Sequence, residues 1–238
     1  MNTDLLVKGA LEFGIEINQE QIKLLAKYKD FLLDWNEKIN LTAIKEEDDF
    51  IIKHFLDSFS IFKCGNLPVG AKLIDVGTGA GFPGIPLKIL RPDLDVLLLD
   101  SLNKRVKFLN NAADEIGLTG ITAVHGRAEE LGRNALYKGK FDVCVSRAVA
   151  EMKTLSEYCL PFVKQGGCFY AMKGREIDDE LNRAKPAIAA LNGSVIDVKE
   201  INLPFSDINH TIIVVKKFAK HRQNISQKQT TFHKNKKK

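Results

Sequence analysis

The sequence predicts an α/β fold in which a mostly parallel sheet carries helices on both faces. Short apolar runs alternate with helical patterns five times after Lys72, and such alternation is typical of parallel strands joined by helices. A glycine-rich turn follows the first of these runs, as in folds that bind a nucleotide beside their strand ends. Two late apolar runs have no helix between them, which predicts an antiparallel pair at one edge of the sheet.

Residues 1–70 are expected to form a helical extension that packs on the sheet. Asn18 and Gln21 have the spacing of a capping box, and apolar residues follow them at helical intervals. A second helix is expected from about Glu46 to Phe62. The segment 65–70 contains two glycines and a proline, so we interpret it as a linker to the domain predicted at 71–217.

The predicted elements of that domain follow one another in a regular order. The parallel strands are expected at Leu73–Val76, Val96–Leu99, Ile121–Val124, Phe141–Val145 and Cys168–Met172. The helices are expected at Ile85–Leu90, Leu102–Gly117, Met152–Val163 and Ile177–Leu191, and the closing pair of strands at about Val195–Ile201 and Thr211–Lys216. A closing antiparallel pair is unusual in dinucleotide-binding domains and typical of the seven-stranded methyltransferase variant of the doubly wound fold.

Composition places the chain among ordinary globular proteins. Hydrophobic residues make up 45% and charged residues 27% of its 238 residues. No apolar run approaches the roughly 20 residues that a bilayer requires, and the N-terminus lacks the basic start of a signal peptide, so we expect a cytoplasmic protein with no membrane partner. The four cysteines form no C-x-x-C pair, and we expect reduced thiols and no metal. The sequence sets no oligomeric state, and a monomer is the working expectation.

The C-terminal end differs in charge from the rest of the chain. Nine basic residues and no acidic residue lie between Lys216 and Lys238, whereas the preceding residues are mildly acidic. We expect residues 218–238 to be a disordered basic tail. Two roles stay open for it: a solubilising segment, or an arm that attracts a phosphate backbone.

The glycine-rich turn allows two cofactors. The dinucleotide fingerprint G-x-G-x-x-G of an NAD-dependent oxidoreductase is matched by Gly79, Gly81 and Gly84. The predicted strand, however, ends at Val76, so the first turn glycine is Gly77, and a fingerprint counted from there would need glycine at Phe82. A glycine turn of this kind also suits S-adenosylmethionine, which has no pyrophosphate and needs close approach of the backbone. We therefore favour S-adenosylmethionine.

Acidic residues lie at or just after the ends of the first three predicted strands, in positions suited to that cofactor. Asp75 is placed to help bind the cofactor's ammonium group. Asp100 closes the second strand, where a carboxylate accepts hydrogen bonds from ribose hydroxyls in either class of cofactor. Glu129, beside Ala128, follows the third strand and suits the adenine edge.

Several motifs make the chain similar to one family. They are Trp35–Thr42, His54–Ser58, Ile74–Pro86, Asp100–Arg105, Ser146–Ala148 and Tyr170–Gly174. With these motifs the chain resembles the bacterial ribosomal small-subunit methyltransferase G family, also called glucose-inhibited division protein B. The resemblance covers about residues 20–215, and it does not extend to the lysine-rich tail.

The resemblance implies a Rossmann-like class I fold that transfers a methyl group from S-adenosylmethionine to N7 of a guanine in 16S rRNA, near the decoding centre. The partner would be 16S rRNA or the 30S ribosomal subunit. It implies cofactor contacts from Gly77, Phe82, Ala128, Glu129 and Arg147, and the loop glycines Gly79 and Gly81 belong to the same site. A non-catalytic RNA-binding protein with this fold is a second alternative, besides the oxidoreductase.

The chemistry explains why no catalytic base is apparent in the sequence. Guanine N7 carries a lone pair and no proton, so the enzyme has mainly to align the reacting atoms. Arg147 follows the fourth strand and is expected to orient the cofactor or the target base. The residues expected to bind the RNA or to line the entrance of the pocket are Asn40, Thr42, His54, Asp57, Arg105 and Lys173.

Overall fold

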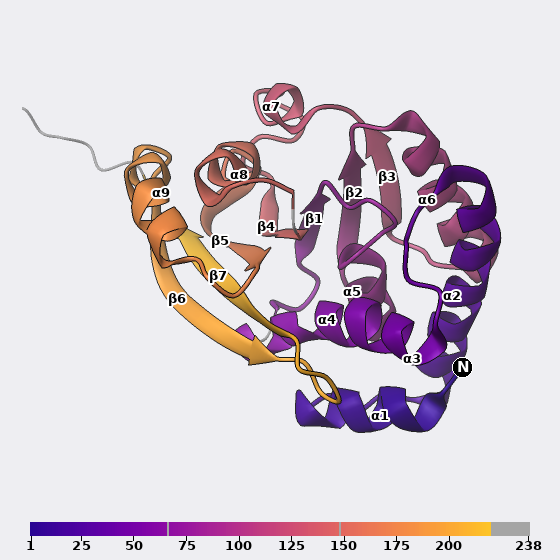
Figure 1. Ribbon diagram of the computed structural model, residues 1–238. Helices are drawn as coiled ribbons and strands as arrows, with labels where there is room; N and C mark the ends of the chain where they lie inside the picture. Colours follow the sequence, from indigo (N-terminus) through magenta and orange to yellow (C-terminus); the bar gives the residue numbers. More distant parts are fainter. Residues whose placement is uncertain (66, 148, 220–238) are drawn as a thin grey trace, which may run out of the picture.

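The computed structural model describes residues 1–65, 67–147 and 149–219. Its centre is a seven-stranded sheet with the order β3-β2-β1-β4-β5-β7-β6 (Figure 1). The strands are β1 (Lys72–Val76), β2 (Asp95–Asp100), β3 (Ile121–His125), β4 (Phe141–Arg147), β5 (Val163–Lys173), β6 (Gly193–Asn202) and β7 (Asn209–Lys217). The first five are parallel, and β7 pairs antiparallel with both β5 and β6. The predicted fold class is confirmed.

The register of the parallel strands brings their carboxyl ends to one edge of the sheet. Val76 lies opposite Leu99, and Arg147 lies opposite Met172. The strand order reverses between β1 and β4, and open α/β sheets bind ligands at such a point. The structure therefore places the predicted site residues of five strands along the same edge.

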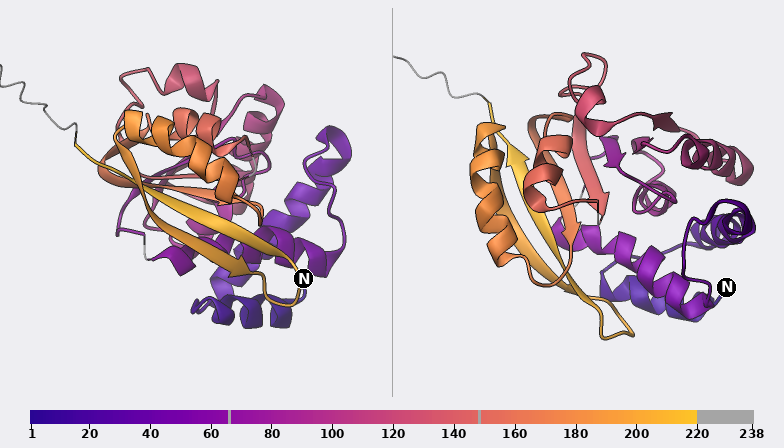
Figure 2. Two further views of the ribbon diagram at one scale, coloured as in Figure 1. Left: turned by 60° about the vertical axis from the view of Figure 1, so that its left-hand side comes forward. Right: turned by 45° about the horizontal axis from the view of Figure 1, so that its top comes forward.

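Alternating side chains of the strands fill two separate cores. On β7, Ile212 and Val214 belong to one core, whereas Ile213 and Val215 belong to the other, as the two-residue period of a strand requires. The first core lies under α5 (Gly84–Leu90), α6 (Asn103–Ile116) and the N-terminal helices. The second lies under α7 (Ala128–Leu131), α8 (Met152–Cys159) and α9 (Asp178–Ala190). Figure 2 shows the two helical layers on opposite sides of the sheet.

The N-terminal helices share the first core with the sheet. Helix α1 spans Thr3–Glu12 and α2 spans Gln19–Ile39. The predicted capping box is present: the Asn18 side chain accepts from the Gln21 N–H at 2.9 Å, and the Gln21 side chain accepts from the Asn18 N–H at 3.0 Å. Leu6, Leu25 and Tyr28 are completely buried in this core. The extension therefore shares its core with the sheet.

The predicted second helix is interrupted by a π-helical segment. The helix begins as α3 (Glu47–Phe50) and continues as the π-helix η1 (Ile51–Leu56) and as α4 (Asp57–Phe59). It ends as the 3₁₀-helix η2 (Ser60–Cys64). The helix buries Phe50, Ile51, Ile52, Phe55, Leu56 and Phe59. Single π-helical turns within a helix are often found at functional sites.

Strand β5 is longer than predicted, and α8 is shorter. The sequence suggested a turn at the two glycines that precede Cys168, but both lie inside the strand. A Cβ atom on Gly167 would lie 2.6 Å from the carbonyl oxygen of Asp142 on β4. The glycine therefore allows a close approach between neighbouring backbones. Helix α8 ends at Cys159 rather than at Val163.

The end of the described chain bears on two other expectations. Phe218 donates its N–H to the carbonyl of Asn192 at 2.8 Å, so the first residue of the predicted tail is tied to the sheet. Residues 220–238, which hold most of the basic tail, lie outside the described residues. None of the helices in the described chain combines the length and the apolar character needed to cross a bilayer.

Candidate active site

The glycine turn after β1 is held in shape by hydrogen bonds to β2. Gly77 and Thr78 donate their N–H groups to the carbonyl of Leu99 on β2, at 2.8 and 3.1 Å. Gly77, Gly79 and Gly81 all have a positive φ, between 61° and 94°, a backbone conformation that residues other than glycine rarely adopt. The structure thus confirms that the turn begins at Gly77.

Asp75 supports this turn from below. Its side chain is completely buried, and its Oδ2 accepts hydrogen bonds from the Thr78 hydroxyl at 2.7 Å and the Gly84 N–H at 2.8 Å. Burial raises the pKa of Asp75 to about 6. Because the carboxylate bonds within the loop and does not line the cavity at this edge, the geometry favours a supporting role over the direct ammonium contact that the sequence suggested.

Asp100 joins the glycine turn to the start of α6. Its Oδ2 accepts from the Gly79 N–H at 3.0 Å, its Oδ1 accepts from the Leu102 N–H at 2.8 Å, and Arg105 lies 3.5 Å away. Each carboxylate oxygen has a second lone pair, so these bonds leave acceptor capacity for ribose hydroxyls. Arg105, expected at the RNA, instead forms an ion pair with Asp100 here.

A cavity at this edge brings together predicted residues from three strand ends. It has a volume of about 170 Å³ and is lined by Val76, Gly77, Leu99, Asp100, Ser101, Gly126, Arg127, Ala128, Glu129, Val149 and Tyr158. The sequence reasoning missed Val149 and Tyr158. A Cβ atom on Gly77 would lie 2.6 Å from Cγ2 of Val149, so Val149 fills the space next to the turn and keeps the cavity small.

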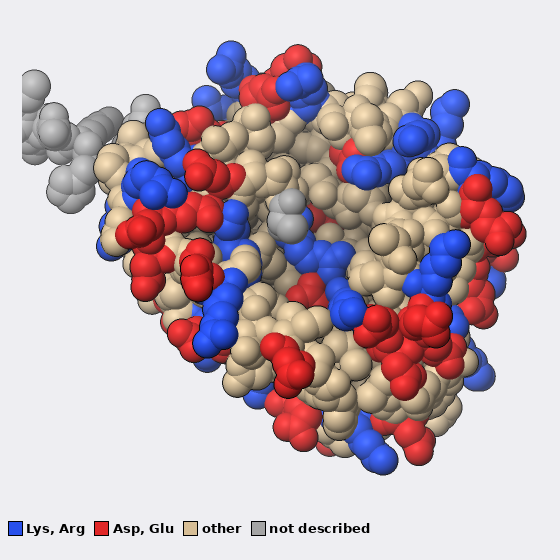
Figure 3. Space-filling model, in the orientation of Figure 1, with Lys and Arg blue, Asp and Glu red and all other residues tan. Residues whose placement is uncertain are grey.

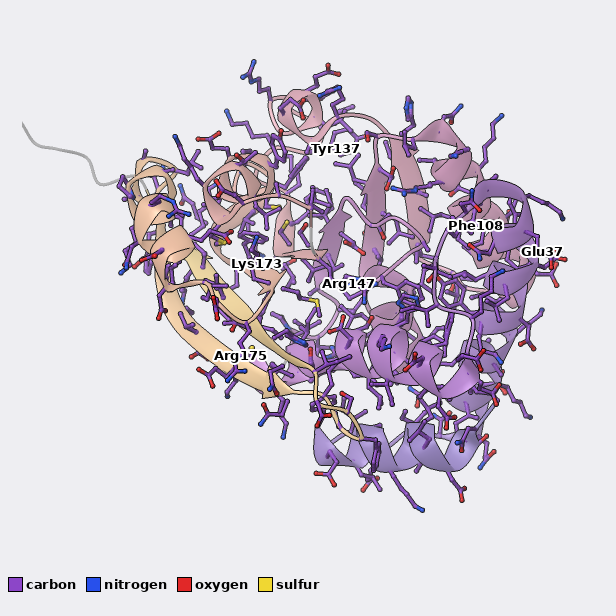
Figure 4. All side chains as sticks on the ribbon, in the orientation of Figure 1. Glu37, Phe108, Tyr137, Arg147, Lys173 and Arg175 are labelled. Carbon is purple, nitrogen blue, oxygen red and sulfur yellow. The ribbon has the colours of Figure 1, made fainter. Side chains whose placement is uncertain are left out.

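A second cluster adjoins the turn and centres on Arg147 at the end of β4 (Figure 4). The Arg147 Nη1 atom donates to Asp57 Oδ2 at 2.6 Å and to the Lys53 carbonyl at 3.1 Å, and its guanidinium lies 5.1 Å from the centre of the Phe82 ring. The His54 ring stacks on Phe82 with 4.4 Å between centroids. These residues come from β4, the π-helix η1, the start of α4 and the glycine turn.

His54 is buried and neutral in this cluster. Burial, followed by the positive charge of Arg147, lowers the pKa of His54 to about 3. Its Nε2 lies 2.8 Å from the Thr42 hydroxyl, and its Nδ1 lies 3.5 Å from Nη2 of Arg147. Thr42 is in turn placed by Asn36, whose side chain accepts from the Thr42 N–H at 2.8 Å. The structure thus brings together two residues that were expected at the entrance of the pocket, and Asn36 was not predicted.

Asp57 lies between two basic side chains. Its Oδ1 is 3.0 Å from Nδ1 of His210 on β7, a close contact that is not aligned as a hydrogen bond. Burial alone would raise the pKa of Asp57, but the contacts with His210 and Arg147 outweigh it and hold the pKa below its usual value. His210 was not predicted from the sequence, since no motif connects it to residues about 150 positions earlier.

Lys173, expected to bind phosphate, is engaged inside the protein. Its Nζ donates to the carbonyl of Ala150 and pairs with Glu180 on α9, both at 2.7 Å. The Glu180 carboxylate also accepts from the Met152 N–H. These contacts tie down the segment that follows β4 and carries Val149. Asn40 ends α2 in a left-handed conformation and is exposed.

The space-filling view shows a hollow in the centre of the face that carries the site (Figure 3), with both basic and acidic atoms inside it and around its rim. Arg147 and Lys173 lie in the same central region in Figure 4.

All four cysteines are free thiols.

Comparison with known proteins identifies the family. The model of the family described as GidB, rRNA small subunit methyltransferase G, matches residues 21–213. The chain belongs to this family. Among curated relatives, the ribosomal RNA small subunit methyltransferase G of Alkaliphilus metalliredigens is 50% identical over 218 residues, which are 91% of each chain. That of Acetivibrio thermocellus is 53% identical over 217 residues, 90% of this chain and 88% of the relative.

Solved structures with low sequence identity share the fold. A 16S rRNA adenine-N1 methyltransferase variant from Catenulisporales acidiphilia matches with a TM-score of 0.54 at 17% identity, over 63% of this chain and 86% of that one. TrmN from Thermus thermophilus matches with a TM-score of 0.54 at 16% identity, over 71% and 53%.

Membership of the methyltransferase G family confirms the predicted class of enzyme, an rRNA methyltransferase that uses S-adenosylmethionine. It leaves the oxidoreductase alternative without support. Gly84, the last glycine of the dinucleotide fingerprint, starts α5, where that fingerprint also places its last glycine for close packing of the helix on the sheet, so this glycine does not discriminate between the two cofactors. A Cβ atom there would lie 2.4 Å from the Leu98 side chain.

Proposed function

We propose that the protein transfers a methyl group from S-adenosylmethionine to N7 of a guanine in 16S rRNA. The proposal rests on one observation: the residues suited to the cofactor and the residue suited to the base lie next to each other at one edge of the sheet. Gly77, Asp100, Ala128 and Glu129 line one cavity, and Arg147 lies beside the glycine turn that forms its wall. A family of small-subunit rRNA methyltransferases supplies the class of acceptor.

The cavity residues fit the cofactor in kind. Gly77 offers backbone that a Cβ atom would obstruct, and Asp100 retains acceptor capacity for ribose hydroxyls. Glu129, whose carboxylate pairs with Arg127 at 2.7 Å, lies where the adenine edge is expected. When bound, S-adenosylmethionine supplies a methyl group already activated by the sulfonium, so these residues have only to bind and orient it.

The acceptor nitrogen places few demands on the protein. Guanine N7 has an in-plane lone pair and no proton, so the reaction needs no general base. His54 is neutral, but its Nε2 is occupied by Thr42 at 2.8 Å. We assign His54 the task of supporting Phe82 and Arg147 instead.

Arg147 is the residue we assign to the base. Both hydrogens of its Nη1 are used by Asp57 and Lys53. Guanidinium carries five N–H donors, and one hydrogen of Nη2 is shared with His54 Nδ1 at 3.5 Å, so Nε and the second hydrogen of Nη2 remain for the base, and 21% of the side chain is exposed. A donor from Arg147 to guanine O6, next to N7, would fix the base in the plane needed for transfer.

The deciding experiment maps the methylated base. The protein is incubated with labelled S-adenosylmethionine and either unmodified 16S rRNA or 30S subunits, and the product is analysed by nuclease digestion and mass spectrometry. We expect one 7-methylguanosine per 16S rRNA. A label on another base would refute the N7 assignment, and binding of RNA with no transfer would support the non-catalytic alternative.

The same experiment tests whether the substrate is free 16S rRNA or the 30S subunit. A higher rate with 30S subunits than with free rRNA would identify the assembled particle as the substrate. We propose that the protein acts as a cytoplasmic monomer. Sedimentation with and without RNA tests the monomer, and fluorescence microscopy of a tagged protein tests its location.

A further inference from the structure

The sequence placed Asp57 among the residues that bind RNA, but its carboxylate is only 13% exposed and is turned toward protein groups. Oδ2 accepts a 2.6 Å hydrogen bond from Arg147, and Oδ1 lies 3.0 Å from His210. Both oxygens are therefore engaged within the protein. Any effect of Asp57 on the acceptor has to pass through another residue.

His210 is itself held on its other side. Its Nε2 lies 3.2 Å from the Ser60 hydroxyl, which donates to the carbonyl of Asp57 at 2.5 Å. The chain of contacts thus runs from β7 through His210 and Asp57 to Arg147 on β4. It links the antiparallel part of the sheet to the centre of the site.

The charge of Asp57 has a chemical consequence at this place. In methyl transfer to guanine N7, the N7 lone pair forms the new N–C bond and the C–S pair returns to sulfur. The positive charge therefore moves from sulfur onto the guanine ring. An unpaired arginine beside that ring would oppose the transfer, because like charges repel strongly where water is excluded. Arg147 can donate to the base at low electrostatic cost only if its charge is balanced.

We propose that Asp57 is a positioning and charge-balancing residue for Arg147, and that His210 holds Asp57 in place. The charge-balancing half rests on the proposed function, because it needs a base that becomes cationic. The positioning half concerns Arg147 alone and does not depend on which RNA is methylated. The experiments therefore address the two halves separately.

The first experiment observes Arg147 directly by NMR of its side-chain N–H groups. In the native protein we expect a resolved, slowly exchanging Arg147 signal, assigned by its absence in Arg147→Met. Asp57→Asn should broaden or shift this signal, and His210→Gln should do so to a smaller extent. Unchanged signals in both variants would overturn the positioning role. Asp93→Asn is the matched control, since it removes a carboxylate that pairs with Arg91 at 2.7 Å outside the cleft.

The second experiment measures kcat, KM for RNA and S-adenosylmethionine affinity in a double-mutant cycle. Asp57→Asn should lower kcat by about 10- to 100-fold, since a displacement of about 1 Å can cost roughly 100-fold. KM should stay equal or fall, because the site becomes more positive. Combined with Arg147→Met, the substitution should cause no further loss, because Asp57 acts through Arg147.

Three outcomes would contradict the proposal. They are a kcat of Asp57→Asn within twofold of native, losses that multiply in the double variant, or a fall in cofactor affinity that accounts for the whole loss. If Asp57→Asn does not fold, the cycle with His210→Gln replaces it, with an expected loss of about three- to tenfold. If the native protein methylates no guanine N7, the proposed function fails, while the NMR experiment still decides whether Asp57 positions Arg147.

Discussion

The cofactor cavity and the Arg147 cluster adjoin each other, yet they are built in different ways. The cavity is made by strand ends and by the turn that starts at Gly77, where a positive φ shapes the backbone. The cluster is made of side chains from the π-helical segment, the glycine turn, β4 and β7, and they contact one another through hydrogen bonds, stacking and ion pairs. The cavity depends mainly on local backbone geometry, and the cluster depends on tertiary packing.

This difference indicates separate tasks. Backbone groups and a carboxylate at strand ends suit a cofactor that many methyltransferases share. A cluster that draws on the N-terminal extension suits a task particular to this family, which is the acceptor base. Substitutions in one region should therefore affect one ligand more than the other.

Arg147→Ala should give the largest difference between the effect on methyl transfer and the effect on cofactor affinity. We expect methyl transfer to fall by at least about 100-fold, comparable to the loss of a key hydrogen-bond donor in other active sites. Cofactor affinity should change by less than about threefold, because Arg147 does not line the cavity. Calorimetry with S-adenosylmethionine and a tritium-transfer assay measure the two effects. A parallel loss of cofactor binding would show that Arg147 contacts the cofactor, as the family resemblance implied.

Gly77→Ala should produce the opposite pattern. The new Cβ atom would be strained at a φ of 72° and would lie 2.6 Å from Val149. We expect cofactor affinity to fall at least about tenfold, which corresponds to about 1.4 kcal/mol. Gly139→Ala is a suitable control, because it has a similar φ of 65° and no atom within 4 Å. Undiminished binding by Gly77→Ala would remove this glycine from the site.

His54→Gln should change the pH dependence of stability more than stability itself. The pKa of His54 is about 3 in the folded protein against a reference value of 6.5. Folding therefore excludes a proton, and this residue costs up to about 1.4 kcal/mol per pH unit as the pH falls below 6.5. Asp75 acts in the opposite direction, since its raised pKa of about 6 adds stability as the pH falls from 6 toward 3.8.

Urea unfolding at several pH values between 7 and 4.5 tests this prediction. The free energy of unfolding of the native protein should include an acid-dependent loss that His54→Gln lacks. In the variant, the remaining effect of Asp75 should flatten the curve or reverse its slope below pH 6. Parallel curves for the two proteins would show that His54 is not the buried neutral group described here.

The sequence predicted the backbone-based region better than the side-chain cluster. Gly77, Asp100 and Glu129 could be placed because each follows a strand whose apolar pattern is local. The role of Asp57 could not be found in this way, since its partners His210 and Arg147 are distant in sequence and meet only in the folded sheet. Asp75 and Lys173 were placed at the correct edge, but only packing decides whether a side chain faces a ligand or the protein.

The π-helical segment shows a similar limit. The apolar residues Ile51, Phe55 and Phe59 are four residues apart, which is the spacing of an ordinary helix, so the pattern does not indicate the π-helical turn. Strand β5 was predicted too short for the opposite reason: two glycines that usually mark a turn instead allow close pairing with β4.

The hydroxyl of Tyr28, in the middle of α2, donates to the carbonyl of Ala80 within the glycine turn. A Cβ atom on Gly81 would lie 2.7 Å from this hydroxyl. The N-terminal extension thus supports the cofactor turn itself and cannot be exchanged as an independent module. An engineer who wished to redirect the enzyme to another RNA by grafting a foreign N-terminal segment would have to retain this tyrosine, or redesign the turn together with the graft.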